Sequence, residues 1–182
     1  MKKILIIIVA FFVFFIAVVF ATFAYSGLFA KVTFEQKEMG PFVVAYMDHV
    51  GDYSKIKEPM DEVYEELKSE GIVCTKGVGV YFDDPKKTEK ENLKSYAGCL
   101  LEGDALSEVS DLQTKMKIYQ LEKGKFAVSS FPYKNTLSII IGVMRVYPKM
   151  SEYISENKLN SAEIVEIYDM ENQVIFYLMP IR

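Results

Sequence analysis

Glu166 is the residue whose type and surroundings in the sequence most suggest chemistry. It lies in the run AEIVEIYD, residues 162–169, and the two-residue period of a β-strand puts it on the same face as Ile164 and Tyr168. A carboxylate among apolar and aromatic neighbours loses hydration, so its pKa rises unless a partner compensates. Such a group can hold a cation or act as a general acid or base. The alternative is a solvent-exposed face on which Glu166 is an ordinary surface acid opposite Lys or Arg.

Aromatic side chains are abundant enough to surround such a carboxylate, because the chain has 12 tyrosines and 13 phenylalanines. Several stand near the ends of predicted elements, where they could line a seam between elements. Aromatic faces with a single carboxylate suit lipophilic or cationic guests. For each aromatic residue taken alone, packing in the core is the competing interpretation. The predicted ligand-binding residues are Glu166, Tyr168, Tyr53, Tyr81, Tyr147 and Phe131.

His49 is the only histidine, and it stands in DHVGDYSKI, residues 48–56, where a predicted strand gives way to a helix. No serine or cysteine has the spacing of a nucleophilic triad with it, which favours a structural role at a strand end. Gly-x-Ser-x-Gly, phosphate-binding glycine and His-Glu-x-x-His motifs are absent. With two cysteines and one histidine, no metal site is predicted. We therefore assign no catalytic residue, metal or cofactor, and favour binding over catalysis.

Cys74 and Cys99 are the only cysteines. They fall in two strand-like runs, 72–82 and 95–103, which the polar segment between them joins as a hairpin. A hairpin symmetric about that segment puts Cys99 opposite Val78, which leaves Cys74 about four residues, or roughly 13 Å, along the strand. A disulfide needs Cα atoms within about 7 Å of each other. The register therefore predicts two free, buried cysteines.

The chain contains the same succession of elements twice. A strand at 42–50, an amphipathic helix at 56–67 and the cysteine-bearing hairpin form the first unit. A strand region at 119–133, a helix at 137–159 and a closing hairpin at 162–181 form the second. Each βαββ unit leaves one sheet face and one helix face to be covered, so the two units should pack against each other.

We therefore predict a compact α+β domain with pseudo-twofold symmetry. It would be built on two antiparallel sheets, or on one continuous sheet, with two helices. The seam between the units is a natural place for a cleft. Pro148 removes one hydrogen bond inside the second helix and should kink or split it there.

The N-terminal segment is predicted to form a membrane-spanning helix. Residues 4–24 carry no charge and, at ~1.5 Å per residue, can cross a hydrocarbon core of ~30 Å. A cleaved signal peptide is the alternative, but its apolar core spans only about 7 to 15 residues, so an uncleaved anchor is favoured. Lys2 and Lys3 outweigh Lys31 and Lys37, which favours a single-pass protein with its N-terminus in the cytoplasm and its domain outside.

The predicted organisation is an anchor at 1–30, a short linker at 31–40 and one domain at 41–182. Within the domain, repeat one takes 41–103 and repeat two takes 117–182. A domain of about 150 residues is large enough for a core of its own, and we expect a monomer. With 21 basic and 25 acidic residues the net charge is -4, and no basic stripe forms, so nucleic acid is not a predicted partner.

The soluble part of the chain resembles the GyrI-like small-molecule-binding family in four stretches. HVGDYSKI resembles the family's His-x-Gly-Pro-Tyr corner, and VGVYFDDP resembles its Gly-x-Tyr-Tyr-Asp-x-Pro hairpin. GKFAVSSFPY is similar to the strand that opens the second repeat, and EIVEIYD is similar to the family's Glu-Ile-Tyr strand. The second helix, LSIIIGVMRVYPKMSEYISENKL, is similar to that of the family's membrane-anchored branch.

The resemblance implies a duplicated βαββ fold of the SHS2 type with a small-molecule pocket between the repeats. The family's pocket glutamate would correspond to Glu166, with Tyr168 beside it. Two departures concern the ligand: Asp52 stands where the family has a proline, and the tryptophan of many family pockets is absent. The chain also has no helix-turn-helix segment, so the resemblance does not extend to transcription regulators.

Three functions are compatible with these features. The favoured one is a membrane-anchored domain that binds small lipophilic or cationic molecules in an aromatic pocket with one glutamate. Some GyrI-like proteins hydrolyse strained cyclopropane-type toxins with a pocket glutamate, so the resemblance also allows a hydrolase. The third is a membrane-tethered adapter that recruits another protein.

Overall fold

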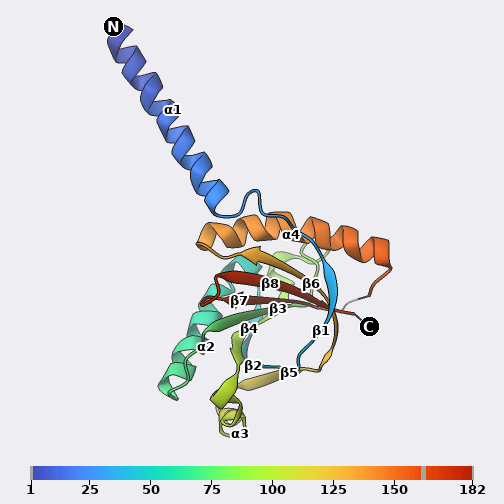
Figure 1. The fold of residues 1–182 in the computed structure, drawn as a ribbon. Helices are drawn as coiled ribbons and strands as arrows, with labels where there is room; N and C mark the ends of the chain where they lie inside the picture. The colour runs from blue at the N-terminus through green and yellow to red at the C-terminus, as the bar shows by residue number, and fades with distance from the viewer. Residues whose placement is uncertain (1, 161–162, 182) are drawn as a thin grey trace.

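The computed structural model describes residues 2–160 and 163–181. An N-terminal helix stands clear of a domain that is built on one eight-stranded sheet (Figure 1). The helices are α1 (Lys2–Tyr25), α2 (Lys57–Ser69), α3 (Val109–Leu112) and α4 (Thr136–Asn157), with short 3-10 turns η1 (Tyr53–Lys55), η2 (Lys90–Asn92) and η3 (Gly103–Leu106). The strands are β1 (Glu35–Met39), β2 (Phe42–Val50), β3 (Lys76–Tyr81), β4 (Lys94–Leu101), β5 (Lys117–Leu121), β6 (Gly124–Pro132), β7 (Ile164–Asp169) and β8 (Val174–Pro180).

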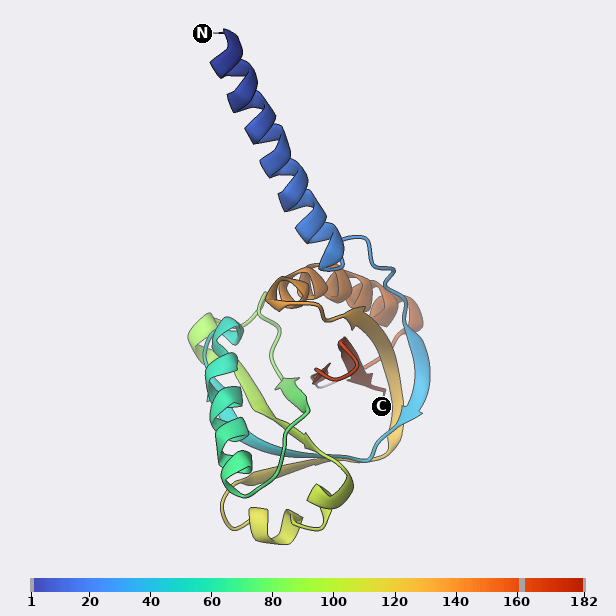
Figure 2. The same cartoon turned by 60° about the vertical axis from the view of Figure 1, so that its left-hand side comes forward.

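The sheet is antiparallel throughout, with the strand order β1-β6-β8-β7-β3-β4-β2-β5. It curls into an open half-barrel, and α2 and α4 lie against its outer side (Figure 2). Side chains of the inner face bury one another as the sheet curls: Val44, Val78 and Phe126 are at most 2% exposed, and their cluster contains no helical residue. The predicted α+β class with an antiparallel sheet is confirmed, in its single-sheet form.

The outer face of the sheet carries the two helices in separate clusters. Val63 and Leu67 of α2 pack on β2 and β4, whereas Ile141 of α4 packs on β6, β7 and β8. Because successive strand residues point to opposite faces, β7 gives Ile167 to the inner core and Tyr168 to the cluster beneath α4.

The two halves of the sheet have matching strand orders. β2-α2-β3-β4 forms one half and β6-α4-β7-β8 forms the other, and β3 pairs with β7 where they meet. In each half the middle position of the three strands belongs to the last strand of the unit, β4 or β8. The two halves thus share one strand order, and the duplication of SHS2-type units stays a prediction.

Cys74 and Cys99 form a disulfide, with their Cα atoms 6.0 Å apart, so the prediction of two free cysteines is wrong. Two features of the hairpin explain the error. Cys99 lies opposite Gly77, one residue nearer to Cys74 than a symmetric hairpin gives. Residues 72–75 also lie outside the β3 ladder, so the rise of ~3.3 Å per strand residue does not apply to them. The chain before β3 is therefore free to bring Cys74 against β4.

Pro148 does not split the second helix, because α4 is continuous across it. A proline removes only one helical hydrogen bond, and the side chains on both sides of it, Val146 and Met150, are almost fully buried under the helix. The start of α4 is set by a capping box, in which the Asn135 side chain accepts from the Ser138 amide and the Ser138 hydroxyl accepts from the Asn135 amide.

Gly142 is the point of closest approach between α4 and the sheet. A Cβ at this position would overlap the Tyr177 Oη atom, and Tyr177 is fully buried, so its ring has no room to withdraw. We expect Gly142→Ala to lower the free energy of unfolding by about 1–2 kcal/mol, because overpacking outweighs the better helix propensity of alanine. Chemical denaturation measures this loss.

A second variant isolates the cause of that loss. The Tyr177 hydroxyl has no hydrogen-bond partner among the described residues, so Tyr177→Phe alone should cost almost nothing. Combined with Gly142→Ala, it removes the clashing oxygen and should restore most of the lost stability. An additive double variant would contradict the proposed clash.

The segment that leaves α1 is tied to α4. Ser26 is fully buried, and its hydroxyl bonds to the Asn135 side chain over 3.1 Å. The Arg145 guanidinium donates to the carbonyl oxygens of Leu28 and Ala30. β1 then pairs with β6 at the edge of the sheet. The residues between α1 and β2, which include the expected linker at 31–40, are therefore tied to the domain.

Candidate functional site

Glu166 lies on β7, on the face of the sheet that α4 covers, and is 2% exposed. Three tyrosine hydroxyls donate hydrogen bonds to its carboxylate. Tyr147 of α4 donates to Oε1 over 2.7 Å, and Tyr81 of β3 donates to Oε2 over 3.4 Å. Tyr168 donates to Oε2 from two residues along the same strand. Glu166 is therefore not the surface acid of the alternative interpretation.

Two glycines of β3 make room for neighbouring side chains, Gly79 for the Tyr81 ring and Gly77 for Met60. Gly79 is the register partner of Glu166, and a Cβ there would lie within 2.9 Å of the Tyr81 ring, which folds back over the glycine. Gly77 is the register partner of Tyr168, and a Cβ there would lie 3.0 Å from the Met60 Sδ atom of α2. A larger residue at Gly79 would push the Tyr81 hydroxyl away from the carboxylate.

Burial controls the protonation of the site. It raises the pKa of Glu166 above the ordinary value, and the three tyrosine hydrogen bonds only partly offset this. Burial, followed by the charge of Glu166, raises the pKa values of Tyr81, Tyr147 and Tyr168 well above their ordinary range. The three hydroxyls therefore remain protonated donors at physiological pH.

No basic side chain within the described part of the chain forms an ion pair with this carboxylate. The ion pairs found within residues 2–160 and 163–181 do not include Glu166. A buried carboxylate is usually paired with a cation or holds a metal, yet the described residues contain no group of three or more potential metal ligands. The site is thus a buried carboxyl group enclosed by tyrosine side chains, and the electrostatic complement of its ionised form is a positive charge.

The sequence model of the GyrI-like small molecule binding domain matches residues 32–175. The chain belongs to the GyrI-like family. Over 163 residues it is 29% identical to human testis-expressed protein 264, a match that covers 84% of this chain and 49% of that protein. The mouse homologue is 29% identical over 168 residues, which cover 86% of this chain and 51% of the homologue. The GyrI-like chain thus spans about half the length of these curated relatives.

Solved structures support the GyrI-like fold alone. The C-terminal domain of EcmrR superposes with a TM-score of 0.56 at 10% identity, over 83% of this chain and 98% of that domain. An integron cassette protein from the mobile metagenome of Vibrio cholerae superposes with a TM-score of 0.50 at 14% identity, over 84% of this chain and 99% of that protein.

Two of the predicted ligand-binding residues of this GyrI-like domain lie apart from the carboxylate. The Tyr53 ring packs edge-on against Tyr81, with centroids 4.9 Å apart, but its hydroxyl donates to the Lys94 carbonyl and accepts from the Asp83 amide. Tyr53 therefore stabilises the β3–β4 hairpin through its hydroxyl and packs with its ring against the Tyr81 ring. Phe131 is 1% exposed in the core beneath α4. The structure thus brings Tyr81, Tyr147 and Tyr168 to Glu166, but neither Tyr53 nor Phe131.

Sequence reasoning missed Tyr177 of β8. It is the register partner of Glu166, and its ring centroid lies 6.1 Å from that of Tyr147. Its hydroxyl is buried without a partner among the described residues. A closing hairpin symmetric about 170–173 already pairs 166 with 177, so counting the register would have found this residue.

His49 takes the structural role that the sequence favours. Its Nδ1 atom lies 2.9 Å from the hydroxyl of Ser95, which is its register partner on β4. The histidine ties the end of β2 to β4 and stays away from the carboxylate.

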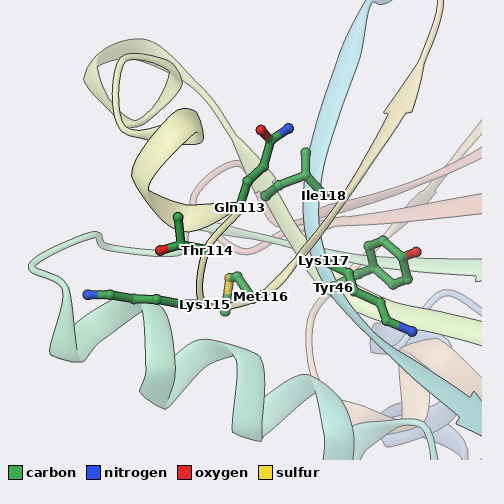
Figure 3. A pocket seen from close by; sticks show the side chains of 7 residues that line it. All are labelled: Tyr46, Gln113, Thr114, Lys115, Met116, Lys117 and Ile118. Carbon is green, nitrogen blue, oxygen red and sulfur yellow. The ribbon is translucent and has the colours of Figure 1, made fainter.

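Two hollows of the structure lie away from Glu166. One of about 410 Å³ is lined by Tyr46 and residues 113–118, at the start of β5. The side chains of Lys115 and Lys117 point in opposite directions there, so their charges do not converge on a common point (Figure 3). The other lies along α1. Because Glu166 itself is covered by its own tyrosines, a ligand reaches the carboxylate only when side chains move.

Proposed function

We propose that this protein is a membrane-anchored domain that binds small lipophilic cations, with Glu166 as their counter-charge and aromatic rings as their walls. The observation that carries the proposal is a buried carboxylate that three neutral hydroxyls solvate and no described basic side chain pairs. Membership of a small-molecule-binding family supports it. A fold needs no such group, because an apolar residue of similar size would avoid the desolvation cost.

Binding would exchange hydrogen bonds for a charge–charge contact. Tyr147 is the tyrosine that a ligand can displace with least disturbance, because it comes from α4 while Tyr81 and Tyr168 belong to the sheet. A cation at Oε1 would replace one neutral donor by a full charge in a site of low dielectric. The freed rings could then contact the cation with their faces. The unpartnered hydroxyl of Tyr177 offers a further donor or acceptor to a polar ligand group.

The proposed site straddles the junction of the two proposed SHS2-type repeats. Glu166 and Tyr168 come from β7 of the second half, Tyr81 comes from β3 of the first, and these strands pair with each other. The matching strand orders of the halves support the duplication. Pockets favour such junctions because side chains from both units converge there.

The membrane part of the proposal rests on α1. It has 24 residues and no buried side chain, which at ~1.5 Å per residue gives about 36 Å, enough to span a bilayer. A signal sequence passes the same test of length and composition. Lys2 and Lys3 support a cytoplasmic N-terminus with the domain outside. The Cys74–Cys99 disulfide supports the same orientation, because disulfides persist in oxidising compartments.

Titration of the purified 182-residue chain with lipophilic cations tests this function. Ethidium and related cations are expected to bind saturably, and at a hundredfold excess over Kd to raise the free energy of unfolding by about 2.7 kcal/mol. Neutral aromatic molecules of similar size serve as the control and should bind more weakly. Release of a modified product would favour the hydrolase instead. No shift with any cation would contradict the proposal and leave the adapter function.

A further inference from the structure

The exposed face of α4 changes character along the helix. In its first half Ile140, Val143 and Met144 are 55%, 42% and 71% exposed, and their spacing of three and four places them on one face. In its second half the exposed residues are mainly polar or charged, namely Lys149, Ser151, Glu152, Ser155 and Glu156. An apolar strip limited to half of one exposed helix face is not needed for the core of the domain.

The apolar half of α4 is the half to which the segment that follows α1 is bonded. The Ser26–Asn135 hydrogen bond fixes the end of α1 at the first turn of α4. The Arg145 guanidinium, three turns later, holds the carbonyl oxygens of Leu28 and Ala30. α4 consequently lies across the base of α1, with its N-terminal half beside that base and its C-terminal half running away from it (Figures 1 and 2).

The apolar strip faces the side from which α1 rises. Ser138, Ile141 and Gly142 are the buried residues of this half and turn toward the sheet. At 3.6 residues per turn, Ile140 and Met144 lie on the opposite side of the helix from them. Because α4 lies between the sheet and the base of α1, the strip points away from the sheet and toward the anchor's side.

We propose that residues 136–147 of α4 lie in the interface of the bilayer that α1 crosses, with Ile140, Val143 and Met144 inserted at the boundary of headgroups and acyl chains. This rests on the proposed membrane anchor. Interfacial helices bury their apolar face by about 5–10 Å in this way. Tyr25 and Phe29, 66% and 65% exposed beside the base of α1, are the aromatic residues expected at the same level.

The placement has a consequence for ligand entry. Tyr147, whose hydroxyl bonds to Glu166, follows Met144 by three residues on α4. A bilayer against residues 136–147 therefore brings Tyr147, the tyrosine that a ligand is proposed to displace, close to the acyl chains. Lipophilic cations concentrate at this depth of the membrane.

Depth-dependent fluorescence quenching tests the placement. A single fluorophore is attached at Met144→Cys, or at Ser151→Cys as the matched control on the polar half, in the 182-residue chain in phosphatidylcholine vesicles. The native cysteines are paired and do not label. Lipids with a spin label high on the acyl chain should quench the Met144 probe about twofold and leave the Ser151 probe almost unchanged, as insertion by about 5–10 Å requires. Ile140→Ser with Val143→Ser should reduce the quenching at Met144.

A third probe at Phe14→Cys, in the middle of α1, separates the two proposals when it is measured with lipids that carry the spin label near the end of the acyl chain, at the depth of the bilayer centre. If lipid quenches Phe14 but not Met144, the interfacial placement is wrong and the anchor stands. If neither probe is quenched, the anchor itself is wrong and the placement falls with it. A Met144 signal that depends on protein concentration instead of lipid would indicate a second copy on this face. If the fluorescence of the Met144 probe changes only when ethidium is added, and not with lipid, residue 144 lies at the entrance of the ligand site. Either result overturns the placement.

Discussion

Glu166→Gln is expected to weaken the binding of lipophilic cations at least about tenfold, because the lost charge–charge contact in a desolvated site exceeds ~1.4 kcal/mol. The same substitution should raise the free energy of unfolding of the ligand-free protein at neutral pH. Burial raises the pKa of Glu166 in the folded state, which means that the fold favours the neutral carboxyl over the carboxylate. Glutamine keeps the shape and the acceptor oxygen without the charge.

The stability difference should depend on pH in a defined direction. The folded pKa of Glu166 lies above its ordinary value of 4.5, so the favourable contribution of the protonated group is complete below that value. It is lost as the pH rises through the folded pKa, and each unit of elevation corresponds to about 1.4 kcal/mol. The advantage of Glu166→Gln over the unsubstituted protein should therefore be absent in acid, grow through this window and then level off. Denaturation at a series of pH values measures it.

Cation affinity should follow the opposite course, because only the carboxylate attracts a cation. Ethidium binding should weaken as the pH falls through the folded pKa of Glu166. Glu152→Gln makes the same chemical change at an exposed position and should alter neither property. Undiminished ethidium binding by Glu166→Gln would show that the cation site lies elsewhere. If Glu166→Gln lowers the free energy of unfolding at neutral pH, the hydrogen bonds from the three tyrosines to the carboxylate stabilise the fold by more than the buried charge costs.

The sequence predicted those parts of the site that depend on strand alternation. Glu166 and Tyr168 share a face because they are two residues apart on one strand, and no other information is needed. Tyr81 and Tyr147 were predicted only as aromatic residues near element ends, since their approach to the carboxylate depends on the pairing of β3 with β7 and on the crossing of α4. The spacing of side chains along the sequence predicts neither the pairing of these strands nor the position of the helix.

Tyr53 shows the limit of composition-based reasoning. Its ring does lie beside Tyr81, but its hydroxyl serves the backbone of a hairpin, a use that no pattern in the sequence reveals. The repeated succession of elements predicted the fold class. The single curled sheet, and the strand β1 within the expected linker, depend on pairings between distant segments.

Loss of the Cys74–Cys99 disulfide is expected to have the largest effect on stability. Its cysteines are 25 residues apart, and opening a loop of that length in the unfolded chain corresponds to about 3.5 kcal/mol at 25 °C in the chain-entropy account. For a domain with a typical stability of about 5–15 kcal/mol this is a large fraction. The loop contains β3, which carries Tyr81, so partial unfolding there would also open the site.

Two forms of the protein separate the cross-link from the packing of its sulfur atoms. Reduced protein keeps both sulfurs in the core, whereas Cys74→Ala with Cys99→Ala removes them and leaves a small cavity as well. Denaturation midpoints should fall in the order oxidised, reduced, double alanine variant. Reductant should leave the double variant unchanged, because it has no cross-link to lose. Equal midpoints for oxidised and reduced protein would contradict the predicted contribution.

The same cysteines test the proposed placement of the domain on the outer side of a membrane. In an oxidising compartment both are paired, so a maleimide added to denatured cell extract should label them only after reduction. In a reducing compartment the thiols would label without reductant. Labelling without reductant would place the domain on the cytoplasmic side and reverse the proposed orientation. It would leave the charge of Glu166, and the cation binding that follows from it, untouched.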